Sequence, residues 1–224
     1  MPGLIFDCDG ILADTEALIS QATRQMFREL YDAEIPAEAF IPFIGRGEEM
    51  YTQGPADAYG IEIDLPTAAR RREECFAAMV EDGPDISFPG TDDLIRAAHE
   101  AGWKLAIATS SSRAKSAKAL KAAKVPLELF EIRVTGDDIT HKKPDPEIYL
   151  KAAEAIGLDP AECIGIEDSV SGVGSVIAAG MRCVAVTNSF KREEIAEAHW
   201  VVDSLTEVTL PDLQNLLDGV AAGN

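Results

Sequence analysis

The 224-residue chain is long enough to bury the core of one substantial domain, or of one domain that carries a smaller insert. Its 39 acidic residues outnumber its 20 basic ones, and the net charge of −19 disfavours an extended contact with nucleic acid or with an anionic membrane surface. A small anionic ligand would therefore need local positive charge, which a magnesium ion and a few Lys or Arg side chains could supply.

The cysteines and the N-terminal residues bear on the cellular compartment. The four cysteines lie far apart and form no C-x-x-C pair, which argues against a zinc site and against a secreted disulfide framework. The first residues contain no basic region followed by a long apolar stretch, and no later segment is long and apolar enough to span a bilayer. We therefore expect a soluble cytoplasmic protein.

Short apolar runs rich in branched residues predict buried strands along the chain. They lie at residues 4–6, 104–108, 131–134, 163–166, 182–186 and 200–202. Helical patterns that end before a glycine separate several of these runs, at residues 92–101, 145–156 and 171–179. The alternation of strands and helices predicts an α/β fold with a parallel, doubly wound sheet.

The segment between residues 15 and 85 interrupts this alternation. It contains several amphipathic helical patterns and no convincing strand, and turn residues mark both of its edges. We expect residues 1–14 and 86–224 to form the core and residues 15–85 to form an inserted helical domain, which its two linkers would allow to hinge.

Polar residues follow four of the predicted strands, at the sheet edge where parallel sheets bind ligands. They are Asp7 and Asp9 after the first strand, Thr109 and Ser110 after the second, Lys143 in the loop after the third, and Glu167 with Asp168 after the fourth. Clustered carboxylates repel one another, and a hard divalent cation relieves that repulsion. Ligands that are all oxygen atoms suit Mg²⁺.

Each of these residues also has a chemical role in phosphoryl transfer. Asp7 has the placement of a nucleophile, and Asp9 that of a proton donor to the leaving oxygen and later a proton acceptor from water. The Thr109 hydroxyl and nearby amides can hold phosphate oxygens, and Lys143 can balance the charge of the transferring group. Taken alone, D-x-D-G is common in turns and Thr or Ser in helix caps. Four such signals in order favour a catalytic site.

These residues resemble the four motifs of the haloacid dehalogenase superfamily, in its β-phosphoglucomutase-like subgroup of phosphatases and mutases. The resemblance covers nearly the whole chain and rests on residues 6–16, 143–149, 167–172 and 178–181. It implies a Rossmann-like core with a helical cap inserted after the first strand, and an aspartyl-phosphate intermediate on Asp7. It also implies Mg²⁺ bound by Asp7, the backbone carbonyl of Asp9 and Asp168, with Glu167 next to the metal.

The resemblance leaves three activities to compare. Dehalogenases of the superfamily lack the second aspartate of the first motif, and Asp9 is present here. Mutases of the subgroup typically carry a histidine where this chain has Ile19, which favours a phosphatase acting on a small phosphorylated metabolite, such as a sugar or polyol phosphate. A hexose phosphomutase is the alternative. A non-catalytic metabolite sensor is a second alternative, against which the full set of catalytic side chains argues.

Two further expectations concern the insert and assembly. Residues 43–49 lie where the family has its specificity loop, and Arg46 is the candidate there for contact with a second anionic group of the substrate. An arginine exposed to solvent at a helix start is an equally weighted alternative. The sequence does not fix the oligomeric state, and a monomer is the default expectation.

Overall fold

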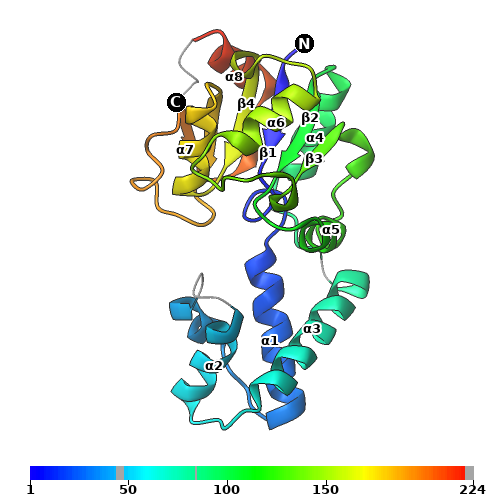
Figure 1. Cartoon of the computed structure of the whole chain (residues 1–224), viewed down its shortest axis with the longest axis vertical. Helices are drawn as coiled ribbons and strands as arrows, with labels where there is room; N and C mark the ends of the chain where they lie inside the picture. Colours follow the sequence, from blue (N-terminus) through cyan, green and yellow to red (C-terminus); the bar gives the residue numbers. More distant parts are fainter. Residues whose placement is uncertain (44–47, 84, 220–224) are drawn as a thin grey trace. The chain divides into compact units, whose positions relative to one another are not determined.

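The computed structural model describes residues 1–43, 48–83 and 85–219, and the chain divides into two compact units. One unit, called here the sheet unit, comprises Met1–Asp14 and Ser87–Asn224. The other, called the helical unit, comprises Thr15–Ile86. Figure 1 shows the helices and strands of both units.

A six-stranded parallel sheet forms the centre of the sheet unit, in the order β3-β2-β1-β4-β5-β6. The strands are β1 (Gly3–Phe6), β2 (Lys104–Ala108), β3 (Ile132–Val134), β4 (Cys163–Glu167), β5 (Arg182–Val186) and β6 (Trp200–Val202). The chain runs outward from β1 to β3 and then returns to place β4 beside β1. Such a reversal opens a crevice at the carboxyl ends of the two strands. The predicted doubly wound parallel sheet is confirmed.

Helices cover both faces of the sheet (Figure 1). On one face α6 (Glu147–Ala155) packs on β1, β2 and β3, and α7 (Val170–Ala178) packs on β4 and β5. On the other face α4 (Thr91–Glu100) contacts β2, and α8 (Leu210–Leu217) contacts β4. Helix α5 (Arg113–Ala122) follows β2.

Burial on both faces explains why the strands are continuous apolar runs. In β1, Ile5 belongs to the apolar cluster under α6 and α7, while its neighbours Leu4 and Phe6 are fully buried as well. At Gly165 the sheet leaves no space for a side chain, because a Cβ atom would lie 2.5 Å from a methyl carbon of Val176 in α7. The helices therefore pack directly on the strand backbone.

Helix α6 begins two residues later than its sequence pattern predicts. Its N-cap residue is Pro146, and the backbone N–H of Glu147 donates to the Asp145 carboxylate at 3.0 Å. The predicted start at residue 145 was wrong because Asp145 and Pro146 form the turn that leads into the helix.

The described residues of the helical unit form three helices and a 3-10 segment. They are α1 (Thr15–Tyr31), η1 (Ala37–Phe43), α2 (Glu48–Tyr59) and α3 (Leu65–Asp82). Helices α1 and α3 pack along each other, and α2 contacts η1 and α3. Their shared core is an apolar cluster that includes Phe27, Phe40 and Tyr51, and Ile19 packs against it. None of the helices in the described part of the chain is long and apolar enough to cross a membrane.

Candidate active site

Asp7 directly follows β1 at the crevice between β1 and β4. Its backbone N–H donates to the carbonyl of Ile166 at 3.0 Å, which extends the pairing of the two strands by one residue. The residue is 7% exposed, and this burial raises the pKa of its carboxyl well above the usual value. The charge of Lys143 opposes that rise in pKa, whereas Glu167 and Asp168 reinforce it.

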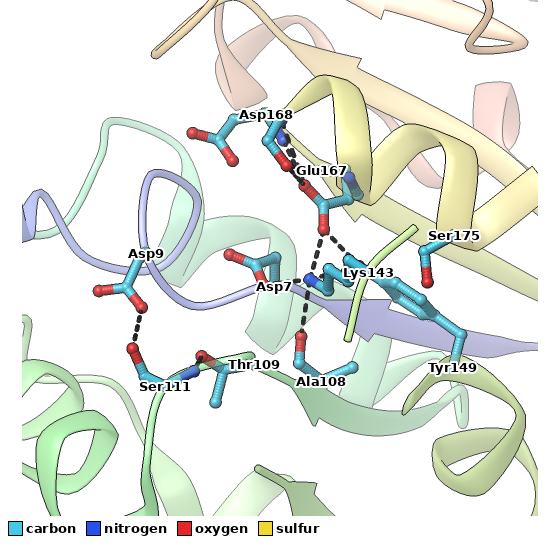
Figure 2. A network of polar contacts seen from close by, with 12 residues as sticks. Asp7, Asp9, Ala108, Thr109, Ser111, Lys143, Tyr149, Glu167, Asp168 and Ser175 are labelled. Carbon is cyan, nitrogen blue, oxygen red and sulfur yellow. Dashed lines mark hydrogen bonds and ion pairs between the residues drawn. The ribbon is translucent and has the colours of Figure 1, made fainter. Parts of the chain in front are cut away.

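Lys143 joins the ends of three strands (Figure 2). Its ammonium donates to Asp7 Oδ1 at 2.5 Å, to Glu167 Oε1 at 2.5 Å and to the carbonyl of Ala108 at 3.2 Å. It also lies 5.0 Å from the centre of the Tyr149 ring. Burial opposes the charged form, but the two carboxylates outweigh burial and raise the pKa of Lys143 above its usual value. Lys143 is therefore a fixed cation at the crevice.

Glu167 is fully buried, and both of its carboxylate oxygens are occupied. Oε1 accepts from Lys143 and from the Tyr149 hydroxyl, the latter at 2.8 Å. Oε2 accepts from the backbone N–H of Asp168 at 3.0 Å, and from the N–H and hydroxyl of Ser169 at 3.2 and 3.0 Å. Although burial opposes ionisation, Lys143 and these donors lower the pKa of Glu167. Its geometry suits holding Lys143 in place.

Asp168 lies beside Glu167 and is 4% exposed. Burial and then the charge of Glu167 raise the pKa of Asp168 to about 7. Its Oδ2 accepts a hydrogen bond from the Ser189 hydroxyl. A Cβ atom at Gly10 would lie 1.9 Å from the same oxygen, and Gly10 has a φ of +88°. Glycine at position 10 therefore lets the turn after β1 approach Asp168.

These acids have the composition of a site for a divalent cation. One carboxylate oxygen from each of Asp7, Glu167 and Asp168 lies within 4.8 Å of the others, and all three residues are buried. The single ammonium of Lys143 does not balance three carboxylates. Because the oxygens of Glu167 are already occupied, Asp7 and Asp168 are the side chains available to a metal. Oxygen ligands of this kind fit Mg²⁺.

Asp9 and the turn after β2 form the other side of the site (Figure 2). The Ser111 hydroxyl donates to Asp9 Oδ2 at 2.7 Å. Thr109 is fully buried, and its hydroxyl oxygen accepts the backbone N–H of Ser111 at 3.1 Å. Ser110 is exposed. The structure thus brings seven of the eight predicted site residues to one edge of the sheet, and the eighth, Arg46, lies outside the described residues.

Sequence reasoning assigned no role to four residues at this edge. Ser111 binds Asp9, Tyr149 binds Glu167, Ser189 binds Asp168, and the Asn188 side-chain amide donates to the Gly10 carbonyl at 2.7 Å. The sequence did contain a signal for Ser189 and Asn188. Residues 187–189 directly follow the fifth predicted strand, and so they form a fifth polar strand end of the same type as the four that were identified.

Comparison with known proteins gives one family. The haloacid dehalogenase-like hydrolase family matches residues 4–186. Protein CbbY of Rhodobacter capsulatus is 33% identical over 220 residues, which cover 92% of this chain and 94% of that protein. The chloroplastic protein SUPPRESSOR OF QUENCHING 1 of Arabidopsis thaliana is 32% identical over 94% of this chain, but the chain spans only 20% of that protein's length.

Solved structures agree in fold over nearly the whole chain. A variant of CbbY from Rhodobacter sphaeroides in complex with xylulose-(1,5)bisphosphate has a TM-score of 0.67 at 28% identity, with 92% of this chain and 96% of that chain covered. A putative β-phosphoglucomutase from Thermotoga maritima has a TM-score of 0.77 at 27% identity, with 98% of both chains covered.

Proposed function

Because this chain belongs to the haloacid dehalogenase-like hydrolase family and is an enzyme that acts on phosphate esters, we propose that it is a magnesium-dependent phosphatase for a small phosphomonoester. The observation that carries the proposal is the position of Lys143 between Asp7 and Glu167, beside Asp168, at the crevice of the sheet. A nucleophile, a fixed cation and metal ligands meet there, and these are the parts that phosphoryl transfer uses.

In the first half of the reaction Asp7 attacks the phosphorus atom. Lys143 donates to Oδ1 of this carboxylate. One carboxylate oxygen of Asp7 forms the new bond to phosphorus, and the other remains available to a cation. The bond from phosphorus to the leaving oxygen breaks, and Asp9 in its protonated form gives that oxygen a proton. Lys143 stabilises the negative charge of the transferring group, and the Thr109 turn supplies donors to the phosphate oxygens.

In the second half Asp9 is a carboxylate and takes a proton from water. The resulting hydroxide attacks the phosphorus of the aspartyl phosphate, the bond to Asp7 breaks, and inorganic phosphate leaves. Mg²⁺, held by Asp7, Asp168 and the backbone carbonyl of Asp9, would supply positive charge that orients the phosphate and offsets repulsion from the carboxylates.

Two observations support a sugar or polyol phosphate as substrate and hydrolysis as outcome. The related CbbY structure holds xylulose-(1,5)bisphosphate, a phosphorylated sugar. Ile19 stands where mutases of the subgroup carry a histidine, and it packs against the apolar cluster of the helical unit. An apolar residue at this position offers no proton-transfer group to hold Asp9 inactive until a second substrate arrives.

The test is phosphate release from sugar, polyol and short-acid phosphates with and without Mg²⁺, for the wild type and for Asp7→Asn. We expect magnesium-dependent release that falls by at least about 10³-fold in Asp7→Asn, the order lost with a covalent nucleophile. Asp32→Asn is the matched control, because Asp32 is exposed in the helical unit and its φ of 48° is one that Asn tolerates. Its rate should equal the wild-type rate.

Two results would overturn the proposal. Isomerisation of a hexose phosphate without phosphate release would indicate a phosphomutase. Binding of the phosphorylated compounds with no turnover of any would indicate a metabolite sensor.

A further inference from the structure

We propose that Ser189 is a positioning residue that orients Asp168 for metal binding. The loop after β5 then joins the four strand-end segments already described as a fifth part of the site. This inference rests on the proposed function, because the metal belongs to that proposal. It concerns residues that follow β5 and to which the proposed mechanism assigns no contact with the phosphate.

The first argument is the confinement of one Asp168 oxygen. The Ser189 hydroxyl donates to Oδ2, and the backbone of Gly10 lies against the same atom. A Cβ atom at Gly10 would be 1.9 Å from Oδ2 but 3.1 Å from Oδ1. Oδ2 is therefore held by a hydrogen bond and by close packing, and Oδ1 is the oxygen left to bind a cation. The Ser189 bond sets which oxygen is presented.

The second argument is that Asn188, the neighbour of Ser189, holds the turn after β1, which contains another proposed metal ligand. The side-chain amide of Asn188 donates to the Gly10 carbonyl at 2.7 Å. Gly10 directly follows Asp9, whose backbone carbonyl is a proposed ligand. Two adjacent residues of one loop thus fix the turn after β1 and the acid after β4.

The third argument is that this loop is itself anchored to β6. The backbone N–H of Thr187 donates to the Val202 carbonyl at 3.1 Å, and the Thr187 hydroxyl donates to Asp203 Oδ1 at 2.9 Å. Arg192 donates to the same Asp203 oxygen at 2.7 Å. A hydrogen bond from an anchored loop restricts the Asp168 side chain more than one from a mobile loop would. Less conformational entropy is therefore lost when the metal binds.

Residues that orient metal ligands typically contribute 10- to 100-fold in metal affinity, roughly as much as the loss of one good hydrogen bond to a charged group. We therefore expect Ser189→Ala to raise the dissociation constant for Mg²⁺ about tenfold. Ser189→Thr, which keeps the hydroxyl, should stay near the wild-type constant. In phosphate release, Ser189→Ala should need more Mg²⁺ for half-maximal rate and approach the wild-type kcat when Mg²⁺ is saturating.

The experiment is calorimetric titration of Mg²⁺ into the metal-free full chain, with no phosphate ester present. Ser111→Ala is the matched control, since it also deletes one hydroxyl bound to a carboxylate of the site, but that carboxylate is the side chain of Asp9. Its Mg²⁺ affinity should be unchanged while its phosphate release falls. Circular dichroism of each metal-free variant checks that it is folded, and Ser189→Cys provides a second variant of nearly the same volume with a weaker donor.

An unchanged Mg²⁺ affinity in Ser189→Ala and Ser189→Cys would overturn the inference, as would an equal loss of affinity in Ser111→Ala. If the wild type releases phosphate with Mg²⁺ and the Ser189 variants bind Mg²⁺ normally, this inference alone fails. If Ser189→Ala weakens Mg²⁺ binding but the wild type hydrolyses no phosphate ester, the proposed function alone fails.

Discussion

Replacing Lys143 with Met would remove the cation that contacts both Asp7 and Glu167 while keeping a side chain of similar length. The Lys143 side chain is 7% exposed, so the ion pairs lie largely out of contact with water. Removal of one partner of a buried ion pair costs about 3–5 kcal/mol, because the remaining charge has no compensation. A domain has about 5–15 kcal/mol of stability in total. We therefore expect Lys143→Met to be folded but strongly destabilised at neutral pH without Mg²⁺.

The loss of unfolding free energy in Lys143→Met should depend on pH, and the direction of this dependence follows from Asp7. Burial already raises the pKa of Asp7, and loss of Lys143 removes the main influence that lowers it. A carboxyl whose pKa is higher in the folded state than in the unfolded state stabilises the fold at low pH, and that stabilisation disappears as the pH rises through the folded-state pKa. The loss of stability in Lys143→Met should therefore become smaller as the pH falls. Added Mg²⁺ should shrink it as well, since a bound cation stabilises the folded state.

The assay is urea unfolding followed by tryptophan fluorescence. Both tryptophans, Trp103 and Trp200, lie in the sheet unit, so the signal reports that unit. Lys142→Met is the matched control, because Lys142 is the exposed neighbour, and its free energy of unfolding should stay within about 0.5 kcal/mol of the wild type. A Lys143→Met protein as stable as the wild type at pH 8 without metal, or a deficit that grows on acidification, would refute the reasoning.

Two further predictions concern the packing around the site and the far end of the sheet. Gly172→Ala should destabilise the fold by several kcal/mol and displace Glu167, because the added Cβ would lie 1.9 Å from the Glu167 carboxylate. Gly174→Ala, in the same helix, is the control. Its added Cβ would have its nearest contact at 3.4 Å, so this variant should be as stable as the wild type or more stable by up to about 1 kcal/mol. Urea midpoints of the two variants test this difference, which should vanish if Glu167 can move freely. His199 Nδ1 accepts a hydrogen bond from the backbone N–H of Cys183 at 3.1 Å, and burial lowers the pKa of the His199 imidazole. The unfolded chain therefore binds a proton at this histidine before the folded protein does, and the free energy of unfolding should fall as the pH drops below about 6.5. His199→Asn keeps an acceptor without titrating, and an equally steep pH profile in that variant would contradict the assignment.

The fold could be predicted from the sequence because each level of the pattern agrees with the others. Strands buried on both faces are short runs of branched apolar residues, and a glycine follows most helices, as at Gly102 and Gly157, where φ is positive. Helix starts were less predictable. Asp145 and Pro146 are compatible with a first helical turn, and only the bond from Glu147 to Asp145 shows that they precede it.

The site was predicted as a set of strand ends but not as a network. Asp7 and Asp168 stand out because a carboxylate directly after a buried strand is unusual, whereas Ser189 and Asn188 have the composition of an ordinary turn. No local pattern shows that five donors reach Glu167, because two of them, Lys143 and Tyr149, are distant from it in the sequence.

The position of β1 has a consequence for how the chain assembles during synthesis. β1 is synthesised before all the other strands of the sheet, yet it is a central strand, and Gly3 pairs with Lys104 on one side and with Cys163 on the other. Both edges of β1 are open until β2 emerges, and one edge stays open until β4 emerges; open edges of this kind invite wrong pairing. The helical unit, whose residues all precede β2 in the chain, is available to fold during that delay. We expect late closure of the sheet around β1, so nascent chains that stop before Cys163 should be sensitive to protease in residues 1–14.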